Sequence, residues 1–186
     1  MIYPVFPLAR GLVPSMQLSL QIFEQRYLRM VRDCMERGLP FVVSPLSSGA
    51  EVGLQAEFPA AGCLARVVDW DTLPSGLLGI RVEGDQRVAL AAPEQEADGL
   101  WQTEATALQD SRQLALPEDY SGIRELLQQI TPGEIRFEVL DCSEIGWMLA
   151  AALPMEASSM ASLLMENDPV ERMEMLVQLV DRLAQR

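Results

Sequence analysis

The stretch LSLQIFEQRYLRMVRDC, residues Leu18–Cys34, changes its hydrophobic period in the middle. In its first half the apolar residues occupy every second position, as in a strand with one buried face: Leu18, Leu20 and Ile22. In its second half they recur with the spacing of a helix: Tyr27, Met30, Val31 and Cys34. No glycine or proline separates the two patterns. The stretch therefore predicts a strand over 16–22 that passes directly into a helix over 23–37.

Strand patterns dominate the first part of the chain. We predict further strands at 1–8, 40–46, 62–70, 77–90 and 100–108. Pro4 and Pro7 cannot donate ladder hydrogen bonds, so the first strand is expected at a sheet edge or broken at these residues. Gly84 and Asp85 predict a two-residue turn that splits 77–90 into a hairpin.

After about residue 110 the apolar period changes to that of helices. We predict helices at 117–130, 141–153, 156–167 and from Pro169 onward. Asp141 and Glu144 form a capping pattern, and Asp168 precedes a proline at the first helical position. Strands followed by helices indicate an α+β chain. We expect a bent sheet or pseudo-barrel over residues 1–110 and a helical subdomain over residues 111–186.

The charge composition excludes several classes of site. The formal net charge is −13, the chain has no histidine, and all 14 basic residues are arginine. Without histidine there is no Ser-His-Asp mechanism and no histidine metal ligand. Without lysine there is no Schiff base and no phosphate-binding loop. An acidic surface also repels phosphate backbones, which disfavours nucleic acid as a partner.

The cysteines and the apolar stretches indicate a cytoplasmic protein. Cys34, Cys63 and Cys142 are odd in number and far apart, which suits buried free thiols better than disulfides or a zinc site. The N-terminus lacks the basic region of a signal peptide. The apolar stretch GWMLAAALPM is too short to span a bilayer. We therefore expect a soluble protein without a membrane partner.

Three segments in order resemble one known family. They are VFPLARGLVPSMQLSLQIFEQRYLRMVRDC, GCLARVVDWDTLPSGLLGIRVEGDQRVAL and EIGWMLAAALPMEASSMASLLMENDPVERMEMLVQLVDRL. They resemble the N-terminal, substrate-binding domain of ATP-dependent Lon proteases. Six residues match the family pattern IFE-x-RY and the family's G-x-x-R return strand, and we interpret them as a structural motif: Phe23, Glu24, Arg26, Tyr27, Gly84 and Arg87. Val88 departs from the family, which usually has an aromatic residue there.

The resemblance implies a fold and a role. The fold is a PUA-like β-subdomain with one inserted helix, followed by a helical bundle. No ATPase or protease module follows the helical tail, so we expect a free-standing member that holds polypeptide and does not cut it. We expect hydrolysis of neither peptides nor ATP, and neither a cofactor nor a bound metal. The resemblance leaves open whether a separate ATPase or protease is a partner.

Two charged pairs have a structural and a functional interpretation. Glu24 can accept from backbone N–H groups at the helix start, and Arg26 can reach a carboxylate or a loop carbonyl. The alternative is that this pair holds the charged end of a ligand. Asp69 and Asp71 are interpreted as turn acids; the alternative is that they meet a hard cation.

Three function classes follow, and we favour a polypeptide-binding module. Its expected contacts are the groove between the two subdomains and apolar residues in turns: Leu12, Val13, Pro14, Met16, Phe58, Pro59, Leu73 and Leu77. The alternative is a nucleic-acid-binding PUA-like protein, which the net charge disfavours. A carboxylate-only enzyme would need two converging acids in a deep pocket.

Overall fold

The computed structural model describes residues 1–49 and 56–185, and the chain divides into two compact units. The first unit comprises Met1–Leu108 together with Met155–Met165. The second comprises Gln109–Pro154 and Glu166–Arg186. The fold is α+β, as the sequence predicts.

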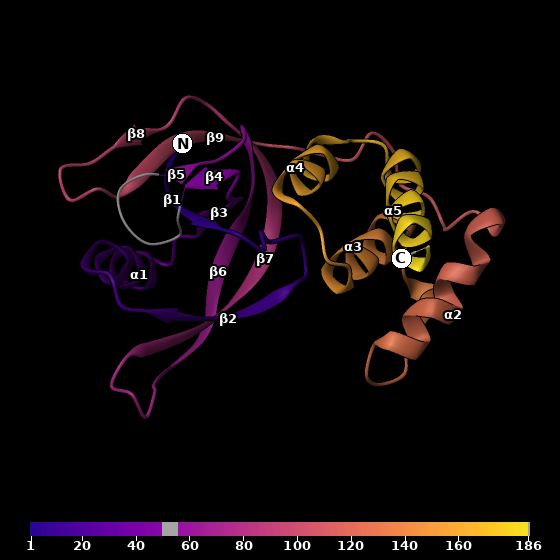
Figure 1. Cartoon of the computed structure of the whole chain (residues 1–186), viewed down its shortest axis with the longest axis horizontal. Helices are drawn as coiled ribbons and strands as arrows, with labels where there is room; N and C mark the ends of the chain where they lie inside the picture. The colour runs from indigo at the N-terminus through magenta and orange to yellow at the C-terminus, as the bar shows by residue number, and fades with distance from the viewer. Residues whose placement is uncertain (50–55, 186) are drawn as a thin grey trace. The chain divides into compact units, whose positions relative to one another are not determined.

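A seven-stranded sheet forms the frame of the first unit (Figure 1). Its strands, in spatial order, are β2 (Gln17–Ile22), β7 (Leu78–Leu90), β6 (Ala61–Thr72), β3 (Phe41–Pro45), β1 (Ile2–Leu8), β9 (Trp101–Ala107) and β8 (Glu94–Gln95). Within the described residues β7 also pairs with β9, so the strands from β7 to β9 close into a ring. This closure confirms the predicted pseudo-barrel and leaves β2 and β8 as the outer strands.

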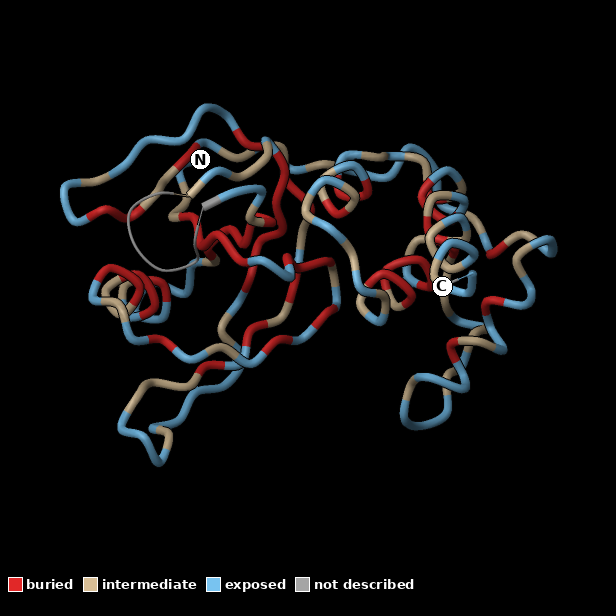
Figure 2. The backbone as a smooth tube through the Cα atoms, in the orientation of Figure 1, coloured by how far each residue is buried: buried red, intermediate tan, exposed pale blue. Residues whose placement is uncertain are grey.

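The ring is mainly antiparallel and encloses a buried core. Of its pairings in the described chain, only β1 with β3 is parallel. All five residues of β3 are buried, and Figure 2 shows buried stretches running along the ring strands. A separate two-stranded sheet consists of β4 (Ser48–Gly49) and β5 (Ala56–Glu57).

The prediction that the first strand lies at a sheet edge is wrong. β1 lies between β9 and β3, but the two partners flank different halves of it. Ile2–Val5 pair with β9, and Val5–Leu8 pair with β3. Pro4 and Pro7 therefore each lie where the strand has a partner on one side only, so a missing N–H is tolerated.

The predicted hairpin turn at Gly84 and Asp85 is also wrong, because β7 runs through both residues as one long strand. The true turn is Leu73–Leu77, which joins β6 to β7. The β6–β7 register shifts between Cys63 and Ala65. The sequence Gly-Asp that suggested a turn thus lies opposite a bulge, which bends the strand.

Helix α1 (Gln25–Arg37) follows β2 after a tight corner, as predicted. Glu24 is its extended N-cap residue, and Gly38 adopts the predicted left-handed C-cap conformation with φ 62°. The Leu39 N–H donates to the Cys34 carbonyl at 2.9 Å, which closes the last turn. Its buried face packs into the first unit, where the rings of Tyr27 and Phe6 lie 4.3 Å apart.

Helix α4 (Ala157–Met165) belongs to the first unit, although its sequence position lies among the C-terminal helices. It packs against β3, β6 and β7 and buries Met160, Leu163 and Leu164. Arg87 of β7, 3% exposed, donates from Nη1 to the Leu164 carbonyl at 2.5 Å. A cation at a helix C-terminus is favourable, so Arg87 ties the end of α4 to the sheet.

The second unit contains the other helices, α2 (Ser121–Ile130), α3 (Cys142–Ala152) and α5 (Pro169–Ala184). The predicted capping box is present, because Asp141 and Glu144 each accept the other's backbone N–H. The Asp168 side chain caps α5 by accepting the Val170 N–H at 2.9 Å. Helices α3 and α5 pack together.

Candidate functional site

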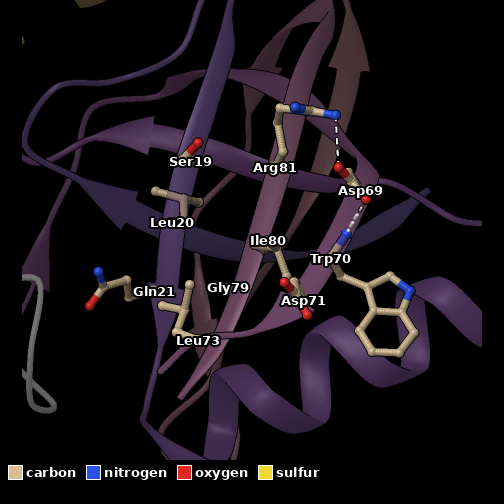
Figure 3. A pocket seen from close by; sticks show the side chains of 10 residues that line it. All are labelled: Ser19, Leu20, Gln21, Asp69, Trp70, Asp71, Leu73, Gly79, Ile80 and Arg81. Atoms are coloured by element: carbon tan, nitrogen blue, oxygen red, sulfur yellow. Dashed lines mark hydrogen bonds and ion pairs between the residues drawn. The ribbon is translucent and has the colours of Figure 1, made fainter. Parts of the chain in front are cut away.

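Three strands project beyond the closed ring and carry a surface hollow of about 250 Å³ (Figure 3). β2 pairs with the first half of β7, from Gln17 opposite Glu83 to Ile22 opposite Leu78. The last part of β6 pairs with the same half of β7 from its other side. Ten residues of these strands and of the connecting turn line the hollow.

One face of this three-stranded extension is apolar. In register, Leu20 lies opposite Ile80, and Ile80 lies opposite Trp70. Ile80 is buried, whereas 58% of Trp70 is exposed. A large aromatic side chain open to solvent at the rim of a hollow is a feature of interaction surfaces.

The opposite face carries the polar groups. Ser19, Arg81 and Asp69 are aligned across the three strands. Arg81 Nη2 lies 2.8 Å from Asp69 Oδ2. Asp71 Oδ1 accepts the Thr72 N–H at 2.7 Å, and Gln17 Nε2 donates to Glu83 at 2.7 Å. In the described part of the chain, the carboxylates of Asp71 and Glu83 have no cationic partner, so this face is net acidic.

Gly79 opens the floor of the hollow. A Cβ at this position would lie 2.9 Å from Leu73 Cδ2. Leu73 therefore folds over the glycine and forms an apolar wall. The Leu73 N–H donates to the Leu77 carbonyl at 2.9 Å, so both leucines belong to the same turn. These two predicted contact residues are half-buried and lie at or beside the hollow.

Three of the other predicted contact residues are core residues, so the expectation that they form an open loop is wrong. Leu12 and Val13 are fully buried, and Met16 is 7% exposed. The loop is pinned to β7, because the Ser15 N–H donates to the Gly84 carbonyl and the Gly84 N–H donates to the Met16 carbonyl. A sequence window with turn residues does not reveal that the turn folds inward.

The remaining predicted contact residues are half-buried: Pro14, Phe58 and Pro59. The Phe58 ring packs edge-on against Trp101 at 5.8 Å and lies on a core cluster that includes Val5 and Leu64. Its aromatic face is thus partly occupied by the protein itself. The structure does not bring these three residues to the hollow.

The structural motif residues support the architectural interpretation of the helix corner. Arg26 is 5% exposed, forms an ion pair with Glu24 at 3.0 Å and donates to the Gly99 carbonyl at 2.8 Å. Its guanidinium also lies 4.5 Å from the centre of the Tyr27 ring. The Glu24 side chain makes no capping hydrogen bond. Phe23, in contrast, is 51% exposed.

A second hollow of about 320 Å³ lies in the first unit beside the start of β1 and α1. Arg29 lines it and forms ion pairs with Glu96 and Asp98. The hydrogen bond with Glu96 raises the pKa of Arg29 above its ordinary value. Because these three charged groups pair with one another, they are less available to a ligand.

The thiols of Cys34 and Cys63 are buried in the first unit. Burial raises the pKa of Cys63 to about 12 and that of Cys34 to about 11. Both thiols are therefore protonated near neutral pH and poor nucleophiles. Over residues 1–49 and 56–185, no group of three or more His, Cys, Asp or Glu could hold a metal ion. Nor does this part of the chain contain a helix long and apolar enough to cross a membrane.

Trp70 is the site residue that sequence reasoning missed. In the sequence, the segment Asp69–Asp71 stands out for its two carboxylates, whereas the tryptophan between them has the pattern of an ordinary strand residue. The β6–β7 register shifts again between Val67 and Asp69, and the residues beyond the shift are exposed. An aromatic residue between two acids, next to a turn, was the available signal.

Comparisons with known proteins agree on one family. The family model of the ATP-dependent protease La (LON) substrate-binding domain matches residues 2–182. A crystal structure of a Lon N-terminal domain protein from Xanthomonas campestris is 28% identical, with a TM-score of 0.80 over 96% of this chain and 98% of that chain. The N-terminal domain of a Mycobacterium avium complex Lon protease shares the fold at 16% identity, with a TM-score of 0.69 over 97% and 98%. No curated protein gives a significant match. The chain belongs to the Lon substrate-binding domain family.

Proposed function

We propose that this chain binds extended or unfolded polypeptide without cleaving it. The observation that carries the proposal is the exposed apolar surface of Trp70, which lines the hollow together with Leu73. Family membership supports a substrate-binding role. An ATP-dependent protease is the partner class that the family description suggests.

Burial of apolar side chains is the source of affinity in this proposal. A neutral chain segment gains nothing from a net charge of −13. Covering a large apolar side chain contributes roughly 2 kcal/mol before the costs of association. The binding is therefore expected to be weak and tolerant of sequence, and segments with both apolar and basic residues should bind best.

The test compares an unfolded probe with its folded counterpart. Reduced, carboxamidomethylated ribonuclease A, an unfolded chain with basic residues, should bind and native ribonuclease A should not, as measured by fluorescence anisotropy. The Trp70→Asp variant should bind about tenfold more weakly, because it removes roughly 1.4 kcal/mol of apolar contact. Its melting temperature should stay close to that of the parent, because 58% of the side chain is exposed.

The matched control is Val139→Asp. Val139 is an apolar side chain with 70% exposure in the second unit, so its replacement makes the same change of charge at another open position. Equal binding by the parent, Trp70→Asp and Val139→Asp would show that the hollow is not the binding site. Absence of any binding to the unfolded probe would refute the proposed function itself.

A further inference from the structure

The free side of strand β2 offers unpaired backbone groups. In an antiparallel pair the hydrogen-bonded residues alternate along each strand. The Gly84 N–H donates to the Met16 carbonyl at 2.9 Å, which fixes the phase of the β2–β7 ladder. Leu18, Leu20 and Ile22 therefore direct their N–H and C=O groups toward β7. Gln17, Ser19 and Gln21 direct theirs to the other side, where no described strand pairs with β2.

The two outer strands of the sheet differ in how they are protected. Proteins usually blunt an edge strand by shortening it or by placing charges, proline or a bulge on it. β8 is only two residues long, Glu94–Gln95, and one of them is charged. β2 is six residues long and contains no charged residue and no proline. Its ladder with β7 runs from Gln17 to Ile22 without a register shift.

We propose that β2 binds an extended polypeptide segment as an added strand, and that the segment alternates apolar and basic residues. This proposal rests on the proposed function and specifies how the polypeptide is held. Backbone hydrogen bonds to Gln17, Ser19 and Gln21 provide the affinity that does not depend on sequence. Strand addition of this kind is an established mode of peptide recognition.

The two faces of β2 define the side chains that suit the added strand. On one face, apolar residues of the segment extend the row formed by Leu18, Leu20 and Ile22, of which Leu20 is only half-buried. On the other face the row is Gln17, Ser19 and Gln21. The residue of the added strand that lies opposite Gln17 is two strand spacings, about 10 Å, from Glu83. An arginine or lysine and the glutamate can close that distance between them.

The charges near β2 favour a foreign segment over a second copy of this chain as the strand that is added to it. Glu83 and Asp71 have no cationic partner among the residues that the structure describes, and the whole chain carries −13. Two copies joined edge to edge would place these negative fields together. A segment with basic residues is attracted by the same field.

The first test removes one outward N–H from β2. The Ser19→Pro variant loses the donor on the free side, whereas the bonds to β7 come from Leu18 and Leu20. A fluorescein-labelled peptide of alternating valine and arginine should bind about tenfold more weakly to this variant. Ser19→Ala removes only the hydroxyl and is the matched control; it should bind as the parent does.

The second test leaves the protein unchanged. N-methylation of the probe peptide at alternate amides should abolish binding in one register and preserve it in the other. Amide hydrogen exchange of Gln17, Ser19 and Gln21 should slow when the peptide is added. Equal effects of both methylation registers, or unchanged exchange at these amides, would overturn strand addition.

The outcomes separate this proposal from the proposed function. If the parent binds carboxamidomethylated ribonuclease A but Ser19→Pro and Ser19→Ala bind the peptide equally, strand addition is wrong and polypeptide binding stands. If neither probe binds, the proposed function fails as well. If these amides become protected only as the protein dimerises in sedimentation experiments, the occupant is a second copy and the proposal is overturned.

Discussion

Gly84 is important for packing, and its sequence context does not reveal this role. Followed by aspartate, it reads as a turn glycine, and the structure places it inside strand β7. A Cβ at this position would lie 2.1 Å from the Val13 carbonyl oxygen and 3.2 Å from Cys63 Sγ. The missing side chain thus lets the buried loop that contains Leu12 and Val13 approach the strand.

The Gly84→Ala substitution should therefore destabilise the protein by about 3 kcal/mol, because the atom that it meets is backbone and cannot move aside. The free energy of unfolding is measured by urea titration followed by circular dichroism. The control is Gly122→Ala, where a Cβ meets nothing within 4 Å and the residue lies in helix α2. That change should stabilise the helix by about 0.5 kcal/mol. An unchanged urea midpoint for Gly84→Ala would show that the loop moves aside freely.

At the scale of elements, local signals were predictable and tertiary placement was not. The capping box of Asp141 and Glu144, the cap at Asp168 and the left-handed Gly38 all depend on neighbouring residues, and all are present. The position of β1 inside the sheet depends on staggered partners far away in sequence. The same holds for α4, whose apolar period does not say which surface it covers. The candidate site was only partly predictable, because Leu73 lines the hollow and Leu77 lies in the same turn, whereas Trp70 was missed.

The anchoring of α4 gives a prediction at this scale. Arg87→Met keeps most of the side-chain volume but leaves the Leu164 carbonyl without its donor. We expect a loss of about 2 kcal/mol, since the bond is buried and charge-assisted. Hydrogen exchange should accelerate in α4 more than in α1. The comparison is Arg66→Met, whose ion pair with Asp85 at 2.6 Å is largely exposed and should contribute less than about 1 kcal/mol.

Equal exchange rates for α4 in the parent and in Arg87→Met would contradict this anchoring. Equal destabilisation by Arg87→Met and Arg66→Met would do so as well, because a surface pair and a buried donor would then be equivalent. The two arginines come from adjacent strands of the same sheet. The comparison therefore separates the effect of burial on the free energy of unfolding from the effect of removing a positive charge.

At the scale of the whole molecule, the excess of acidic residues governs how partners approach. The 27 acidic and 14 basic residues create a negative field that extends beyond any single contact. Apolar burial and backbone hydrogen bonds act only after contact is made. The field should therefore affect the rate of association, and the contacts should affect the rate of release.

Salt separates these two contributions. The screening length falls from about 10 Å at 0.1 M salt to about 3 Å at 1 M, so the association rate of the valine–arginine peptide should fall about tenfold over this range. Its release rate should change little, because short-range contacts hold it. Stopped-flow fluorescence measures both rates. A peptide of alternating valine and threonine is the neutral control, and its association should be nearly independent of salt. The net charge of −13 would not be steering the partner if salt slowed association of the neutral peptide equally. The same would follow if salt changed mainly the release rate of the valine–arginine peptide.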